Sequence, residues 1–107
     1  MEVYRQGDVC FVPITEAQYK EAINPARRWN KAVQTTSSII RKGEHGGQHQ
    51  FEKMDNVELF NTGIGRKYAK TEAPVNIVHK EHGTVELPGG FWEIRIQQDS
   101  QRKAVMD

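Results

Sequence analysis

The stretch TVELPGGFWEIRI, residues 84–96, decides the fold class. Its PGG centre is typical of a turn, and on each side apolar and polar side chains alternate as they do in strands that bury one face. The second run places Trp92, Ile94 and Ile96 on one face and Glu93, Arg95 and Gln97 on the other. We expect the apolar set to lie in a core, which makes this stretch a pair of half-buried strands.

Similar patterns recur along the chain on both sides of this stretch. Alternation, or a run of apolar and β-branched residues, predicts further strands at residues 7–14, 35–40, 50–53, 57–60, 66–70 and 74–80. The run at 66–70 is polar enough to favour an edge position. These short strands do not alternate with helices. They predict a mostly β protein, a small antiparallel β-barrel or sandwich.

One short helix is expected near the N-terminus. The sequence TEAQ, residues 15–18, has the spacing of a capping box, in which the Thr15 hydroxyl and the Gln18 amide each satisfy a backbone group at a helix start. Asn24 and Pro25 then end the helix, because proline cannot continue it.

Length and composition favour one domain over residues 1–107. The chain has 107 residues, and only 36% are hydrophobic, which gives a mean hydropathy of −0.74. A thin core of this kind favours self-association, so a homo-oligomer is expected. The segment 98–107 is polar and is predicted to be a partly frayed tail.

The cellular location follows from cysteine usage and hydropathy. The single cysteine, Cys10, lies in an apolar run and is expected to be a buried core residue in a reducing compartment. No apolar run approaches the ~20 residues that span a bilayer, and the N-terminus lacks the pattern of a signal peptide. We therefore expect a cytoplasmic protein without membrane partners, in the host cytoplasm if a phage encodes it.

The charge balance argues against a general binder of polyanions. Fifteen basic and fourteen acidic side chains leave a formal net charge of +1. A local basic cluster with one indole, formed by Arg27, Arg28, Trp29 and Lys31, leaves a nucleic-acid-binding module as one alternative. A solvated loop whose tryptophan packs onto the core explains the same residues, so nucleic acid is not the favoured partner.

The stretch RKGEHGGQHQF, residues 41–51, is the main candidate site. Its three glycines would let backbone amides approach an anion, and its histidines and glutamines offer donors and acceptors for a polar ligand. A turn at residues 79–82 could supply an opposite wall, with an arginine to neutralise charge. The predicted ligand-binding residues are Arg41, Gly46, Gly47, Gln48, His49, Gln50, Arg66, His79 and His82.

Two other interpretations of these residues stay open. In the first, a divalent transition metal binds to His45, His49, His79 and His82, and Glu44 or Glu81 acts as general base of a cupin-like enzyme. The glutamines on both sides of His49 weaken this hypothesis, because glutamine is a poor ligand for such metals. In the second, the stretch is a wide turn with surface histidines and no ligand.

Three short motifs resemble a widespread family of small uncharacterised proteins from phages and bacterial genomes. They are RQGDV at residues 5–9, a glycine-rich histidine loop after residues 43–44, and HKEHG at 79–83 leading into LPGG at 87–90. The family is without an established activity, so the resemblance implies context rather than mechanism.

The chain departs from the family pattern in two places. Members usually read Gly-His-x-His in the middle loop, where this chain has Gly47, Gln48, His49 and Gln50, and they end in Gln-Arg-Glu-Tyr where this chain has QQDS at 97–100. If the paired histidines bind metal in the family, these glutamines put that ability in doubt here, whereas hydrogen bonding survives the exchange.

The sequence therefore predicts a phage-type binding protein without cofactor. It would recognise or sequester a small polar or phosphorylated ligand, with a nucleotide signal as one candidate, and would not convert it. Whether any catalysis occurs is left open, since no nucleophile stands in a recognisable catalytic setting.

Overall fold

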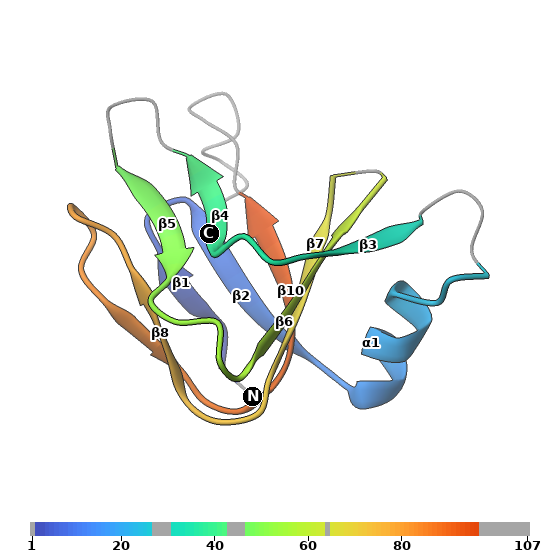
Figure 1. The fold of residues 1–107 in the computed structure, drawn as a ribbon. Coiled ribbons are helices and arrows are strands. Elements are labelled where there is room, and N and C mark those ends of the chain that lie inside the picture. The colour runs from blue at the N-terminus through green and yellow to red at the C-terminus, as the bar shows by residue number, and fades with distance from the viewer. Residues whose placement is uncertain (1, 27–30, 43–46, 64, 97–107) are drawn as a thin grey trace, which may run out of the picture.

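Two antiparallel sheets pack against each other in the computed structural model of the chain, which describes residues 2–26, 31–42, 47–63 and 65–96 (Figure 1). The six-stranded sheet has the order β1 (Tyr4–Gln6), β2 (Val9–Ile14), β10 (Gly90–Ile96), β7 (Lys67–Thr71), β6 (Val57–Thr62) and β3 (Ala32–Thr35). The four-stranded sheet has the order β4 (Ile39–Lys42), β5 (Gln48–Phe51), β8 (Val75–Val78) and β9 (Val85–Leu87). The predicted mostly β class is confirmed, as a sandwich rather than a closed barrel.

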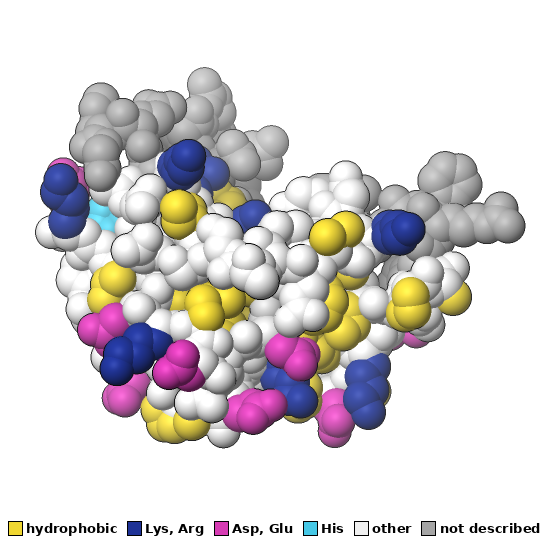
Figure 2. Space-filling model, viewed as in Figure 1, with side chains coloured by type: hydrophobic (Ala, Val, Ile, Leu, Met, Phe, Trp, Pro, Cys, Tyr) yellow, Lys and Arg dark blue, Asp and Glu magenta, His cyan; other side chains and the backbone are white. Residues whose placement is uncertain are grey.

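The main core lies between the two sheets, whereas Figure 2 shows charged side chains of both signs on the outside of the molecule. Its buried members are Val9, Phe11, Ile40, Phe51, Leu59, Ala69, Ile77, Leu87, Trp92 and Ile94. Trp92 and Ile94 come from the face of β10 that the alternation predicted to be buried. The Trp92 indole donates a hydrogen bond to Thr71 Oγ1 at 3.1 Å, so its polar edge is satisfied inside the core.

The helix α1 (Glu16–Ala22) covers the other face of the six-stranded sheet. Its predicted capping box is present, because the Gln18 amide N–H donates to Thr15 Oγ1 and the Thr15 N–H donates to Gln18 Oε1. Tyr19 and Ala22 are its buried residues, and they pack with Tyr68 of β7 in a second apolar cluster. Within the described segments, no helix is long and apolar enough to cross a membrane.

The first strands form a hairpin that the sequence did not predict. The expected strand at 7–14 is shorter, since β2 begins at Val9 and pairs with β1 through Tyr4–Phe11 and Gln6–Val9. Gly7 stands in the turn with φ of 58°, a conformation that glycine adopts without steric cost. The hairpin places Gln6 and Asp8 beside the second sheet.

Three predictions about strand partners are wrong. The segment predicted as one strand at 35–40 is divided between β3 and β4, which lie in different sheets. The PGG turn also connects different sheets, because β9 pairs with β8 whereas β10 pairs with β2 and β7. Finally, β7 is not an edge strand but lies between β10 and β6.

The contribution of the capping box to the stability of α1 can be tested by mutation. Replacing Thr15 with alanine removes the hydroxyl oxygen that accepts from the backbone N–H of Gln18. We therefore expect the free energy of unfolding to fall by about 1 kcal/mol. Urea denaturation of the Thr15→Ala protein measures the change. The exposed Thr36 is the matched control, and an equal loss in Thr36→Ala would contradict the assigned role.

Candidate functional site

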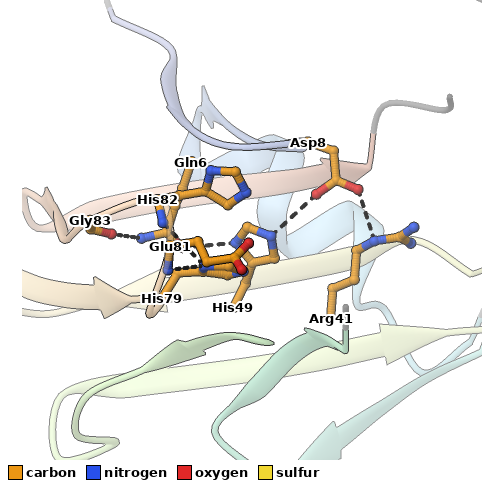
Figure 3. Close-up of polar contacts among 8 residues, drawn as sticks. All are labelled: Gln6, Asp8, Arg41, His49, His79, Glu81, His82 and Gly83. Atoms are coloured by element: carbon orange, nitrogen blue, oxygen red, sulfur yellow. Dashed lines mark hydrogen bonds and ion pairs between the residues drawn. The ribbon is translucent and has the colours of Figure 1, made fainter. Parts of the chain in front are cut away.

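Three of the four histidines lie together at one end of the sandwich (Figure 3). His49 comes from β5, while His79 and His82 come from the turn after β8. The ring centroids of His49 and His79 are 4.3 Å apart, those of His79 and His82 are 4.4 Å apart, and the His49 and His82 rings are nearly parallel at 5.8 Å. The structure thus brings together the two histidine-bearing segments that the sequence singled out.

His49 is the buried member of this imidazole cluster, with 3% of its surface exposed. Its Nδ1 lies 2.8 Å from Gln6 Oε1, and its Nε2 lies 3.2 Å from Asp8 Oδ1. Both partners come from the β1–β2 hairpin, so the ring connects the two sheets. Asp8 also accepts from Arg41, whose Nε is 3.0 Å from Oδ2.

The orientation of the Gln6 amide is fixed by its other contacts. Gln6 is 1% exposed, and its Nε2 donates to the carbonyl oxygens of Ile77 at 2.9 Å and Gly83 at 2.6 Å. A flipped amide would place its oxygen against those two carbonyls. Gln6 Oε1 therefore faces His49 as an acceptor, and His49 Nδ1 must carry a proton.

The charge of His49 depends on opposing effects. Burial lowers its pKa most, the charges of His79 and His82 lower it further, and Asp8 raises it; the sum lies below the ordinary value for histidine. A neutral ring carries one proton, which Gln6 holds on Nδ1. Asp8 is also paired with the Arg41 guanidinium through its other oxygen.

The His79 ring is held by backbone groups, and both His79 and His82 lie close to a glycine. His79 Nδ1 accepts from the backbone N–H groups of Glu81 and His82, at 2.9 and 3.2 Å. A Cβ at Gly47 would lie 2.5 Å from His79 Cε1, and a Cβ at Gly7 would lie 2.7 Å from His82 Cδ2. Glycine at both positions leaves room for these rings.

Arg41 connects the imidazole cluster to a second feature. Figure 3 shows its two terminal nitrogens directed away from the histidines, while Nε faces Asp8. On that side the six-stranded sheet opens, because β10 pairs with β2 as far as Ile96 but with β7 only as far as Ile94. The turn between β6 and β7 therefore stands apart from the end of β10.

A depression of about 470 Å³ occupies this opening. It is lined by Arg41, Gly65, Arg66, Glu93, Ile94, Arg95 and Ile96, and we name it the arginine depression. Glu93 is the buried acid of the group: Arg95 Nη2 lies 3.0 Å from its Oε1, and Arg66 Nη1 lies 3.6 Å from its Oε2. The hydrogen bond from Arg95 raises the pKa of that arginine further above its usual range.

The predicted glycine loop is shorter than expected. Its last part forms β5, where Gln48 and Gln50 are half-buried and hydrogen-bonded to each other, Nε2 to Oε1 at 3.1 Å. His49 stands between them and faces the opposite side, since neighbouring residues of a strand alternate. The three side chains therefore do not form one recognition set. Of the predicted residues, Arg41 joins Arg66 in the arginine depression, and His49 joins His79 and His82.

Several candidates lie outside the described residues. These are Glu44, His45 and Gly46 of the loop, and Arg27, Arg28 and Trp29 of the basic cluster. Lys31 is described and exposed, immediately before β3. Across the segments that the structure describes, no group of three or more His, Cys, Asp or Glu side chains is arranged to hold a metal ion. Glu81, the other proposed base, is exposed.

Sequence reasoning did not select four residues that complete these features: Gln6, Asp8, Glu93 and Arg95. The first two belong to the RQGDV motif, which carried the family resemblance but had no assigned role. Membership in that motif was the only feature of the sequence that could have pointed to Gln6 and Asp8. Nothing in the local pattern of β10 marked Glu93 as buried, because alternation placed it on the polar face.

The chain belongs to the family described as a domain of unknown function, DUF8820, whose match covers residues 5–97. This agrees with the resemblance to an uncharacterised family. The comparison with curated proteins gave no match, and the comparison with solved structures gave none.

Gly47 provides a test of the imidazole cluster. We expect Gly47→Ala to lower the free energy of unfolding, because its new methyl group requires the His79 ring to move away from His49. Overpacking of this kind costs about 1–3 kcal/mol. Gly89→Ala is the control, since a Cβ there would make only ordinary contact, 3.4 Å from the Thr71 carbonyl oxygen. Equal stability of the Gly47→Ala protein and the wild type would refute the packing role.

The pH dependence of stability tests the charge of His49. Its pKa is lowered in the folded chain, so the unfolded chain takes up the proton more readily as the pH falls through the ordinary histidine range near ~6.5. His49 therefore stabilises the fold more at about pH 7.5 than at about pH 5.5. We expect the stability difference between wild type and His49→Gln to shrink on acidification, measured by urea denaturation.

The control is His82→Gln, which removes an imidazole from the same cluster at an exposed position. It shows how much of the pH effect comes from losing any imidazole of the cluster rather than the buried one. A stability difference between wild type and His49→Gln that grows on acidification would reverse the assignment. It would show that Asp8 outweighs burial and that His49 is charged in the folded protein.

Proposed function

We propose that this member of a family of unknown function binds a small phosphorylated ligand without converting it. The observation that carries the proposal is the convergence of Arg41, Arg66 and Arg95 on one depression of about 470 Å³. They come from both sheets, so the fold rather than a single segment assembles the cluster. The volume falls within the range of roughly 300–1,000 Å³ that is typical of small-molecule sites.

The chemistry of the depression suits a phosphate group. A guanidinium presents planar N–H donors that match two phosphate oxygens at once, and it keeps its charge throughout the physiological pH range. Three arginines face two carboxylates, Asp8 and Glu93, which leaves a surplus of one positive charge. The arginine side chains are 42% to 60% exposed, so a ligand can reach them from solvent.

The contacts of His49 argue against a role for this residue as a general base. A general base needs a ring nitrogen within hydrogen-bond reach of the substrate. In His49 both nitrogens face protein side chains, and His79 Nδ1 is occupied by backbone donors. Cys10 is buried at 5% exposure, which suits the core role expected of it. A nucleotide signal remains our candidate ligand, and self-association and a phage origin remain predictions from the sequence.

Calorimetric titration with nucleotides and cyclic dinucleotides tests the proposal. We expect one or more of them to bind, and Arg66→Gln to weaken that binding about ten- to one hundredfold, since a hydrogen bond to a charged group contributes about 1.5–3 kcal/mol. Affinity should also fall with added salt. The matched control is Lys20→Gln, which removes an exposed positive charge from α1. No heat above background for any compound would remove the basis of the proposal.

A transition-metal site is a second candidate, favoured by one observation. His49 Nε2 and Asp8 Oδ1 are 3.2 Å apart, close to the separation of roughly 3.4 Å between two ligands of a tetrahedral zinc ion. Gln6 fixes the ring through Nδ1, as the supporting residues of metal ligands do. The positive charge of Arg41 opposes a cation here, and further ligands would have to come from solvent or from outside the described residues.

Elemental analysis of purified protein separates the two candidates. Stoichiometric zinc, iron or nickel that disappears in His49→Gln would support the metal site. Protein that is metal-free after exposure to these ions would eliminate it, without bearing on the binding of phosphorylated ligands.

A further inference from the structure

Glu93 lines a second depression besides the arginine depression. This second space, of about 390 Å³, lies between α1 and the six-stranded sheet. Its lining residues are Ile14, Ala17, Gln18, Glu21, Ala22, Tyr68 and Glu93, and we name it the helix depression. Because one side chain borders both spaces, the two adjoin at Glu93.

The two depressions differ in charge. Arginines dominate the first, whereas Glu21 and Glu93 are the charged residues of the second. An anionic group is therefore favoured in the arginine depression. A ligand that extends from one space into the other would place a phosphate among the arginines and a neutral or donor-rich part under the helix.

The lining of the helix depression is partly apolar. Ala17 and Ala22 face it from α1 and leave the space that larger side chains would fill, while Ile14 and Tyr68 supply apolar surface from the sheet. Gln18 adds a polar amide at the rim. A lining that combines apolar surface with a few polar groups is typical of small-molecule sites, and an aromatic base would suit it.

The Glu93 carboxylate lies between the two depressions, where it could accept a hydrogen bond from a ligand N–H group. Its side chain is 10% exposed, and Oε1 accepts a hydrogen bond from Arg95 at 3.0 Å. Its Oε2 is 3.6 Å from Arg66, which is an ion pair but longer than a hydrogen bond. This oxygen keeps the capacity to accept an N–H donor, and a buried acceptor gains from such a partner.

We infer that the two depressions form one site for a nucleoside phosphate whose base carries N–H donors. The phosphate binds to Arg41, Arg66 and Arg95, the base lies under α1, and Glu93 accepts from the base between them. This inference rests on the proposed function, and it adds the ligand class and the location of the base.

The first experiment separates the base from the phosphate. Calorimetry compares guanosine 5′-monophosphate, whose base has several N–H donors, with ribose 5-phosphate, which has no base. We expect the nucleotide to bind at least tenfold more tightly to the wild type. Ala17→Trp should remove this preference by filling the helix depression, without changing the affinity for ribose 5-phosphate. Ala17 is exposed, so the substitution does not disturb the core.

Lys20→Trp is the matched control, because it adds the same side chain to α1 at an exposed position outside the helix depression. It should keep the preference for the nucleotide. Equal affinity of the wild type for both compounds would overturn the inference while leaving the phosphate site in place, and so would a preference that survives in Ala17→Trp. If neither compound binds, both the inference and the proposed function fail.

The role of Glu93 is tested with a base that lacks exocyclic donors. We expect the wild type to bind guanosine 5′-monophosphate at least tenfold more tightly than purine riboside 5′-monophosphate, and Glu93→Gln to reduce this ratio. Thermal unfolding shows whether Glu93→Gln folds. If it does not fold, the ratio of the two affinities in the wild type is the test. A ratio near one would show that Glu93 does not recognise the exocyclic donors of the base.

Discussion

The side-chain amide of Gln6 holds the two sheets in register at the end where the candidate site lies. It comes from the short edge strand β1, yet it donates to the backbone of β8 and of the turn before β9, and it faces the ring of His49 on β5. Leaving a buried amide unpaired costs about 1–3 kcal/mol, so all of its partners must be in place together. The position of the β1–β2 hairpin, and with it Asp8 and Arg41, depends on this amide.

Two glycines, Gly7 and Gly47, allow the close packing around Gln6 and the histidines. Gly7 provides the turn after Gln6 and leaves room for His82, and Gly47 leaves room for His79. One glycine of the RQGDV motif and one of the middle loop thus allow imidazole rings to pack closely against the backbone. The sequence did not predict this packing role, because the imidazoles come from a turn more than thirty residues beyond Gly47 and local patterns cannot show such a contact.

The sequence predicted the strands and the helix better than it predicted which strands pair with each other. Alternation identified the buried face of β10, and the TEAQ spacing identified the capping box of α1, since both depend on residues close in the chain. Pairing depends on residues far apart. For that reason the sequence could not show that Thr36 to Ser38 cross between sheets, that the PGG turn does the same, or that β7 is internal. The sequence left open whether His49 meets His79 and His82. It did not select Gln6 and Asp8, because neither is unusual in its local context.

Burial separates the histidines from the arginines as candidate ligand contacts. The polar atoms of Gln6 and His49 are engaged within the protein, and a ligand that displaced those contacts would leave buried groups unpaired. The three arginines are exposed, and their charge exceeds that of their two carboxylate partners. A ligand can therefore contact the arginines without breaking buried contacts, whereas at Gln6 and His49 it must first break them. These costs favour the arginine depression over His49 as the place for the proposed ligand, and Asp8 connects the two by contacting both His49 and Arg41.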